Sequence, residues 1–372
     1  MSSDLHLNIV SFDIPYPPSY GGVIDVFYKI KALSEKGVKI HLHAFHYGRN
    51  KAEILNNLCE EVFYYPRKTF FNPLTSKKPY IVETRKNKNL LQNLVSNDYP
   101  ILIEGIHCSY YLNRPELKHR TKILRMHNIE HIYYLHLAKV EQNWAKRFYF
   151  KFESNRLKKY LQQLNGATKI AAISPSDHIL LNIKLKNSFY LPVFHPNNEL
   201  ISKEGRGDYI LYHGNLGVGE NNEAALFLVN QVFSQLELPF IIAGSNPSRK
   251  LIKSVKAYKH IQLLNPDTEN IYLLIQNAQI NILPTFQETG IKLKLLNALF
   301  RGRHCIVNSK MVKETGLGHL CHIADSPKEF ISTIQELFHR PFAIQDKEFR
   351  KNELSQLFDN QKSAEILIHQ LT

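Results

Sequence analysis

The sequence predicts an α/β protein of two doubly wound domains, each with a parallel sheet covered by helices. Three observations carry this prediction. The chain has 372 residues, too many for one core of ordinary size. Short apolar segments alternate with stretches of helical periodicity, which is typical of parallel sheets with crossover helices. A segment without periodicity, rich in proline, glycine and asparagine, divides the chain at 191–207.

The elements follow in the order that this fold requires. In the first domain, 1–190, the first strand precedes an amphipathic helix from Val23 to Lys36. The expected strands of this domain are 5–12, 38–45, 100–106, 122–127 and 169–174. The second domain, 208–345, has an expected helix at 222–236. A separate helical segment, 346–372, follows this domain. The expected strands of the second domain are 209–214, 239–244, 261–264, 280–285 and 304–308.

Composition excludes several classes of protein. No apolar run approaches the ~20 residues that span a bilayer, and the polar N-terminus passes directly into a strand, unlike a secretory signal. The four cysteines are far apart and form no CxxC pair, which predicts reduced thiols and no structural zinc site. A cytoplasmic protein is expected. The cysteines are Cys59, Cys108, Cys305 and Cys321.

Positive charge is concentrated in the first half of the chain. The net charge is +14. Residues 1–190 have 28 Lys and Arg against 15 Asp and Glu, whereas residues 191–372 have 19 against 18. This asymmetry favours a polyanionic partner, either nucleic acid or an anionic membrane face, and a solvated surface without a partner stays an alternative.

Loops after strands are the candidate sites, because doubly wound sheets bind ligands outside the carboxyl ends of their strands. Gly21 and Gly22 begin a helix after the first strand and leave its amides open to an anion or a sugar, or they only cap a turn. His127 follows a later strand within RMHNIEH, where an imidazole can donate to a sugar hydroxyl or satisfy local backbone groups.

Two loops of the second domain contain glycine. In HGNLGVGENNEA, which includes Gly214, the spacing GxxGxG differs from the dinucleotide pattern GxGxxG and disfavours a nicotinamide enzyme. In PTFQETGIKLKLLNALFRG, Lys292 and Lys294 stand at a helix start that already attracts anions. The sequence therefore predicts a phosphate or diphosphate site there, formed by Thr289, Gly290, Ile291, Lys292 and Lys294.

Two further patterns leave alternatives open. His41, His43 and His46 lie in one strand, but His46 is out of register with the other two, so a metal site is not expected. The segment 144–164 interleaves Lys and Arg with aromatic residues at helical spacing. Such a helix can lie on a membrane surface or simply bury its aromatic residues beneath a solvated basic face.

Together these motifs resemble the glycosyltransferase family 4-like group of GT-B glycosyltransferases over nearly the whole chain. The resemblance is based on PPSYGG, RMHNIEHIYY, ISPSD, HGNLGVGENNEA, IIAGSNP, PTFQETGIKLKLLNALFRG and ETGL. It implies two Rossmann-like domains facing a cleft, with the acceptor in the first and a nucleotide-sugar donor in the second. It also implies that the C-terminal helix packs back toward the first domain.

The resemblance also implies roles for individual residues. Asn265 and Pro266 would contact the nucleobase, and His127 would contact the donor sugar. Gly21 and Gly22 would lie near the phosphates and the acceptor. Gly214, Gly290, Ile291 and Lys292 would line the donor site, with Lys294 and Thr289 at the reacting phosphates and Asn297 toward the ribose.

The chain departs from the family pattern at two places. The usual acidic pair, spaced eight apart, falls on Thr289 and Asn297, and an amide at the second position binds ribose hydroxyls without charge. The basic pair often found after the first glycine of the second domain is missing from GNLGVGENN. Both departures concern the donor site, so they leave room for a protein that binds a nucleotide sugar without turnover.

The resemblance thus implies a metal-independent, retaining hexosyltransferase that needs no cofactor. Its donor, linked to UDP or GDP, would be a substrate. The acceptor is expected to be a glycan or lipid-linked glycan at the inner membrane face, with peripheral contact to anionic lipid. One alternative is a catalytically weak or inactive sugar- or nucleotide-binding protein of the same fold. The other is a nucleic-acid binder, which charge alone supports and for which no motif is present.

Overall fold

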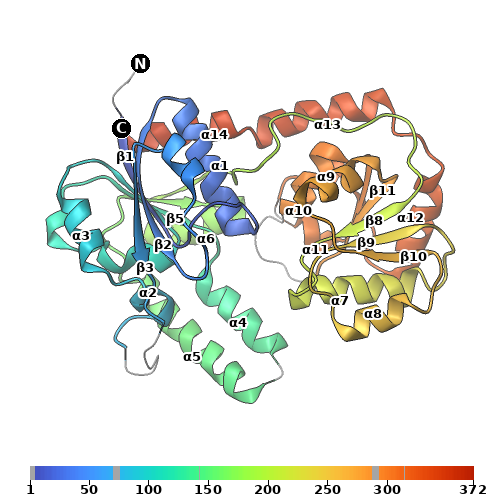
Figure 1. Cartoon of the computed structure of the whole chain (residues 1–372), viewed down its shortest axis with the longest axis horizontal. Helices are drawn as coiled ribbons and strands as arrows, with labels where there is room; N and C mark the ends of the chain where they lie inside the picture. The colour runs from blue at the N-terminus through green and yellow to red at the C-terminus, as the bar shows by residue number, and fades with distance from the viewer. Residues whose placement is uncertain (1–4, 70–75, 142, 287–292, 314) are drawn as a thin grey trace. The chain divides into compact units, whose positions relative to one another are not determined.

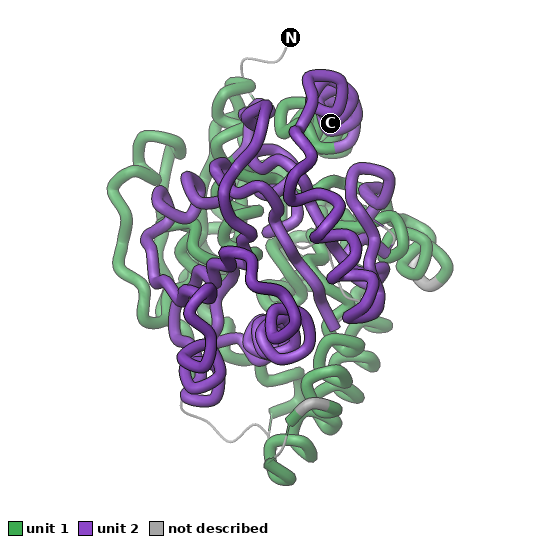
Figure 2. Tube along the Cα trace, turned by 90° about the vertical axis from the view of Figure 1, so that its right-hand side faces the viewer, with its two compact units in different colours: residues 1–196, 358–372 green, residues 197–357 purple. Residues whose placement is uncertain are grey.

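The structure is a computed structural model of the chain and describes residues 5–69, 76–141, 143–286, 293–313 and 315–372. It divides into two compact units (Figure 2). Unit 1 comprises 1–196 and 358–372, and unit 2 comprises 197–357. Each unit is built on one parallel sheet. The predicted α/β class with two doubly wound sheets is confirmed.

Unit 1 contains a seven-stranded sheet in the order β3-β2-β1-β4-β5-β6-β7. All of its strand pairs are parallel. The strands are β1 His6–Ser11, β2 Lys39–His46, β3 Glu61–Pro66, β4 Ile101–Glu104, β5 Lys122–Met126, β6 Lys169–Ala172 and β7 Ser188–Tyr190. The central strands read as nearly continuous apolar runs because helices cover both faces of the sheet.

Helices of unit 1 connect these strands. They are α1 Gly21–Glu35, α2 Tyr80–Glu83, α3 Lys88–Val95, α4 Glu130–Val140, α5 Trp144–Leu161, α6 Pro175–Leu185 and α14 Asn360–Leu371. The last helix, α14, lies beside α1 (Figure 1). Lys36, the residue after α1, forms an ion pair of 2.6 Å with Glu365 of α14. The C-terminal residues therefore complete the first unit.

Unit 2 contains a six-stranded parallel sheet in the order β10-β9-β8-β11-β12-β13. Its strands are β8 Ile210–His213, β9 Phe240–Ala243, β10 Ile261–Leu264, β11 Ile280–Leu283, β12 His304–Val307 and β13 His322–Ile323. Its helices are α7 Gly219–Phe227, α8 Arg249–Val255, α9 Thr268–Asn277, α10 Leu293–Arg301, α11 Ser309–Val312, α12 Pro327–Phe338 and α13 Ile344–Leu357.

Several elements differ from the sequence-based expectation. Helix α7 begins three residues before 222 and passes into a π-helical turn at Leu228–Val232. The segment 346–372 was expected as one helix. It contains all but the first two residues of α13 and all of α14, with Asp359 capping α14. Strands β3, β7 and β13 were not expected. β7 and β13 are only three and two residues long, too short to show alternation.

Candidate active site

A buried group of charged side chains lies at the carboxyl end of the first sheet. Lys29 of α1 contacts Asp25 at 3.0 Å and Glu104, the last residue of β4, at 2.7 Å. Arg125 of β5 donates to both carboxylate oxygens of Asp25, at 3.1 and 3.2 Å. The side chains of these four residues are fully buried. Two carboxylates and two cations thus balance one another in a buried network.

These ion pairs determine the charge of both carboxyl groups. Burial raises the pKa of Asp25, but the attraction of Arg125 and Lys29 outweighs it, and the pKa of Asp25 lies well below its ordinary value. Burial likewise opposes ionisation of Glu104, whereas Lys29 and the hydrogen bond from His127 lower its pKa. Both groups are therefore carboxylates at neutral pH.

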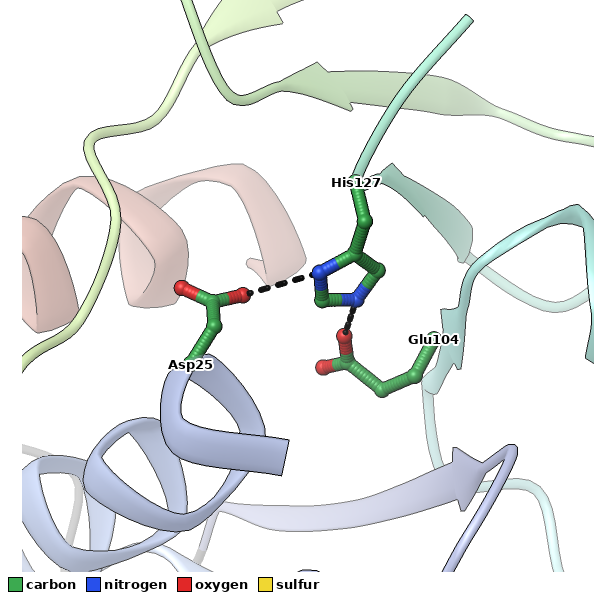
Figure 3. A group of neighbouring side chains, drawn as sticks. All are labelled: Asp25, Glu104 and His127. Carbon is green, nitrogen blue, oxygen red and sulfur yellow. Dashed lines mark hydrogen bonds and ion pairs between the residues drawn. The ribbon is translucent and has the colours of Figure 1, made fainter. Parts of the chain in front are cut away.

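His127, the predicted contact of the donor sugar, belongs to the same group (Figure 3). Its Nε2 lies 2.9 Å from Oε2 of Glu104, and its Nδ1 lies 3.6 Å from Oδ2 of Asp25. Because an ionised carboxylate only accepts, Nε2 carries a proton and donates to Glu104. The ring is thereby held in one orientation, with 9% of its side chain exposed. Its contact with a sugar stays a prediction.

Asp25, Glu104 and His127 also place three ligand atoms within 4.8 Å of one another. Each carboxylate is already bonded to a cationic side chain, Asp25 to Arg125 and both to Lys29. A divalent ion would be repelled by these two cations and would have to displace their hydrogen bonds. The donor set does not fit a metal ion.

The glycines predicted at the first site form the first turn of α1. Packing explains why residue 22 is a glycine, because a Cβ at this position would lie 2.6 Å from the Phe12 ring. The first backbone bond of the helix runs from the amide of Ile24 to the carbonyl of Tyr20, at 3.0 Å. The amides of Gly21 and Gly22 therefore precede the helix ladder. Their approach to a phosphate stays a prediction.

Glu130 begins α4, three residues after His127, and is buried. Burial raises the pKa of its carboxyl from 4.5 to about 7, against the opposing effects of a hydrogen bond from Asn128 and the charge of Arg85. A raised carboxyl pKa stabilises the fold below the ordinary pKa, and this stabilisation is lost as the pH rises through the folded-state value. Glu130 is thus a buried acid that titrates near neutral pH.

We expect Glu130→Gln to become more stable relative to wild type as the pH rises. The unfolding free energy of the variant, minus that of wild type, should be larger at pH 8 than at pH 4 by up to roughly 3 kcal/mol. This is the free energy that corresponds to the raised pKa. Urea unfolding across this pH range measures it. Glu60→Gln, at an exposed carboxylate, is the control and should show no such slope. A pH-independent difference at Glu130 would mean that its carboxyl is not raised.

The second sheet carries a glycine turn where β8 ends. Gly214 follows the strand, and its carbonyl oxygen lies so close to Gly244 that a Cβ on Gly244 would collide with it. Gly244 follows the neighbouring strand β9. The turn leads into α7, whose first residue is Gly219. Two adjacent strand ends thus present backbone without side chains, as close approach of a ligand requires.

Lys294 lies at this edge of the second sheet. Its Nζ donates to Oδ1 of Asn221 at 3.0 Å and lies 5.3 Å from the ring centre of Tyr212. His213, the last residue of β8, is buried beside it. Burial and the charge of Lys294 lower the pKa of His213 to about 3. Within the described residues, Nε2 of His213 has no hydrogen-bond partner.

The structure therefore adds His213, Asn221 and Glu220 to the site predicted around Lys294. Glu220 accepts a short hydrogen bond from the hydroxyl of Thr285, just beyond β11. All three lie in HGNLGVGENN, where sequence reasoning selected only Gly214. The sequence signal was available, because His213 ends a buried strand and a neutral imidazole there offers a polar atom to a ligand.

The other predicted donor residues have different surroundings. Asn265 and Pro266 follow β10, at the same edge of the sheet as the turn after β8. Asn297 accepts a 3.0 Å hydrogen bond from the side chain of Asn197, which in turn accepts from Arg301 at 2.7 Å. Its contact with a ribose stays a prediction. Thr289, Gly290, Ile291 and Lys292 lie outside the described residues.

Known proteins resemble the chain in both sequence and fold. The family described as glycosyl transferases group 1 matches residues 207–340. An uncharacterized 44.6 kDa protein in the cps region of Klebsiella pneumoniae is 26% identical over 335 residues, which cover 84% of each chain.

Solved structures extend the comparison to the whole fold. A mutant of S. aureus TarM, in complex with fondaparinux, alpha-GlcNAc-glycerol and UDP, matches 99% of both chains with a TM-score of 0.66 at 9% identity. HepE of Anabaena, in complex with UDP and glucose, matches 99% of both chains with a TM-score of 0.65 at 11% identity. The chain thus has the GT-B fold, and its residues 207–340 match the glycosyl transferases group 1 family.

Proposed function

We propose that this protein transfers a sugar from a nucleotide-sugar donor to a glycan or lipid-linked glycan acceptor. The family of its second unit supports the reaction class. The relative in the cps region of Klebsiella pneumoniae supports a role in polysaccharide biosynthesis. The two neighbours with UDP in their complexes support a nucleotide-linked donor.

The ammonium group of Lys294 beside His213 is the observation that carries this proposal. An anion placed at the end of β8 would meet the ammonium group of Lys294 and the glycine turn together. The bond between the anomeric carbon and the diphosphate breaks, its electron pair stays on the phosphate oxygen, and the acceptor hydroxyl bonds to that carbon. The hydroxyl proton goes to the leaving diphosphate. Lys294 stabilises the charge that develops there.

Metal independence and retention of the anomeric configuration belong to the same proposal. In many transferases a bound cation neutralises the leaving diphosphate. Here a lysine at the strand ends supplies positive charge without an ion. Turnover should therefore persist in excess chelator, and the product anomer, read by NMR, should match that of the donor.

Release of nucleotide from a panel of sugar nucleotides, with and without acceptor glycans, tests the function. Acceptor-dependent release supports a transferase. Stabilisation by nucleoside diphosphates without release from any donor would support the rival, a binding protein of the same fold, which Asn297 and the missing basic pair keep open. Binding to nucleic acid without any response to nucleotide sugars would contradict both.

The α4–α5 hairpin of unit 1 supports peripheral contact with anionic membrane. The two helices pack along each other (Figure 1). Near the start of α5, Trp144 is 82% exposed and Phe148 is 66% exposed. Lys146, Arg147 and Lys151 around them are exposed. Exposed aromatic residues among basic ones are typical of surfaces that enter the lipid headgroup region. No helix in the described residues is both long and apolar enough to span a bilayer.

We expect the full chain to sediment with vesicles rich in anionic lipid and to release as salt is added. The double variant Trp144→Ser with Phe148→Ser should weaken this binding about tenfold or more, because it removes two large apolar side chains from the interface. Ile183→Ser is the control, at a side chain 71% exposed on another helix. Equal binding to neutral vesicles, or equal loss in the control, would contradict contact through this hairpin.

A further inference from the structure

The second sheet has a cavity at its amino-terminal edge. Strands β12 and β13 begin there with His304 and His322, and a space of about 190 Å³ opens beside them. His319, Arg340, Asp346 and Arg350 also line it. Because the sheet is parallel, this edge lies opposite the carboxyl ends of the strands, near which Lys294 of α10 lies. The cavity is therefore separate from the proposed donor site.

Arg350 is the unusual residue of this cavity. It is buried in α13, and its guanidinium donates to the carbonyl oxygens of Gly302 and Arg303 at 2.8 and 2.7 Å. Its other face packs on the Phe342 ring, 4.6 Å from the ring centre. Within the described residues it forms no ion pair with a carboxylate. A buried guanidinium stays charged, and neutral carbonyls compensate its charge only partly.

A second arginine stands at the same cavity. Arg340 is exposed, and its guanidinium has no hydrogen bond or ion pair in the part of the chain that the structure describes. Asp346 is the acidic group of the lining, and its carboxylate accepts from the amide of Ala343 at 3.3 Å. Two guanidinium groups against one carboxylate leave the lining with excess positive charge.

The imidazoles of the lining add hydrogen-bonding groups rather than charge. Burial lowers the pKa of His304 to about 4, and its Nε2 lies 3.0 Å from the carbonyl oxygen of Arg340. Burial and the charge of Arg340 lower the pKa of His322. His319 pairs with Glu353 at 2.9 Å, on the exposed side. At neutral pH the two arginines therefore dominate the electrostatics of the cavity.

We propose that this cavity is a second ligand site, which binds a small oxyanion of the phosphate or phosphomonoester class between Arg340 and Arg350. Planar guanidinium groups match the oxygen geometry of phosphate. The volume is below the 300–1,000 Å³ of typical drug-sized sites, which suits a small ligand. A metal ion fits less well, because two arginines repel it and the described His and Cys groups here do not bring three ligand atoms together.

Titration of the full chain with inorganic phosphate, at constant ionic strength maintained with chloride, tests the site through the rise in melting temperature. We expect Arg340→Gln to weaken phosphate binding about tenfold, because it removes a charged hydrogen-bond donor. Arg249→Gln, at an exposed arginine of the same unit, and Lys294→Ala should leave this phosphate affinity unchanged. Loss in Lys294→Ala with retention in Arg340→Gln would place the phosphate at the donor site and overturn the proposal.

A label inside the cavity gives an independent readout. Cys321 lines the cavity, and of the four cysteines it has an intermediate exposure whereas the others are buried. At ten times the dissociation constant, phosphate should slow the alkylation of Cys321 about tenfold, since only the empty fraction reacts. Peptide mass spectrometry measures this rate in wild-type protein, so the test does not depend on a variant that folds. Unchanged alkylation in saturating phosphate would also overturn the proposal.

Discussion

Asp25→Asn should lower the free energy of unfolding by about 3–5 kcal/mol, because it removes one partner from a fully buried ion-pair network. Lys29 would still form its ion pair with Glu104. Arg125 would lose its carboxylate partner and still donate hydrogen bonds only to the carbonyl oxygens of Ala172, Leu191 and Pro192. The unit would then bury an uncompensated positive charge. The amide of Phe194, which donates to Asp25 at 2.8 Å, could still donate to the side-chain oxygen of asparagine. The loss of stability would therefore come from the missing negative charge and not from a change in side-chain shape.

Urea unfolding of both proteins at several pH values measures this effect. The pKa of Asp25 is lowered in the fold, so its contribution is present above the ordinary Asp pKa of 3.8 and is lost as the pH falls below it. The gap between wild type and variant should therefore be constant near neutral pH and narrow in acid. Asp98→Asn, at an exposed aspartate, should change stability by less than about 0.5 kcal/mol. A similar small change at Asp25 would refute the network as a source of stability.

Lys294→Ala should weaken the binding of nucleoside diphosphates by about 1.5–3 kcal/mol, the range for hydrogen bonds to charged groups. Turnover should fall further, by about 10²–10³-fold, if the lysine stabilises the leaving diphosphate more strongly than the bound donor. The glycine turn should persist, because Asn221 also donates to the carbonyl oxygen of Asn215 at 2.9 Å. Calorimetry with nucleoside diphosphates and steady-state kinetics measure the two effects.

Lys256→Ala, at an exposed lysine of the same unit, is the control for lost positive charge and should change neither quantity. Binding of the bare nucleoside should hardly change in Lys294→Ala, since it has no phosphate for the ammonium group to contact. Equal loss of nucleoside and nucleoside diphosphate binding would make Lys294 a structural residue. The proposed donor site would then have to lie elsewhere.

The alternation of apolar strands and amphipathic helices was sufficient to predict the architecture from the sequence. A buried parallel strand must be apolar on both faces, and a crossover helix must be apolar on one face. The continuous apolar runs and the helical periodicity that result can be read directly from the sequence. The turn at Gly214 and the lysine at the start of α10 were predicted for a similar reason. Each depends on a strand end and the helix after it, which are neighbours in the chain.

Tertiary structure decided what surrounds these residues. Asp25, Glu104 and His127 come from three separate segments: α1, the end of β4 and the residue after β5. These segments come together only because the strands are ordered β1-β4-β5 in the sheet. Nothing local in RMHNIEH shows that the ring of His127 would donate to Glu104. Arg350 likewise reads as a solvated residue in a charged helix, yet it is buried. Local periodicity specifies elements, because their hydrogen bonds are short-range, whereas contacts between charges distant in the chain depend on how the elements pack.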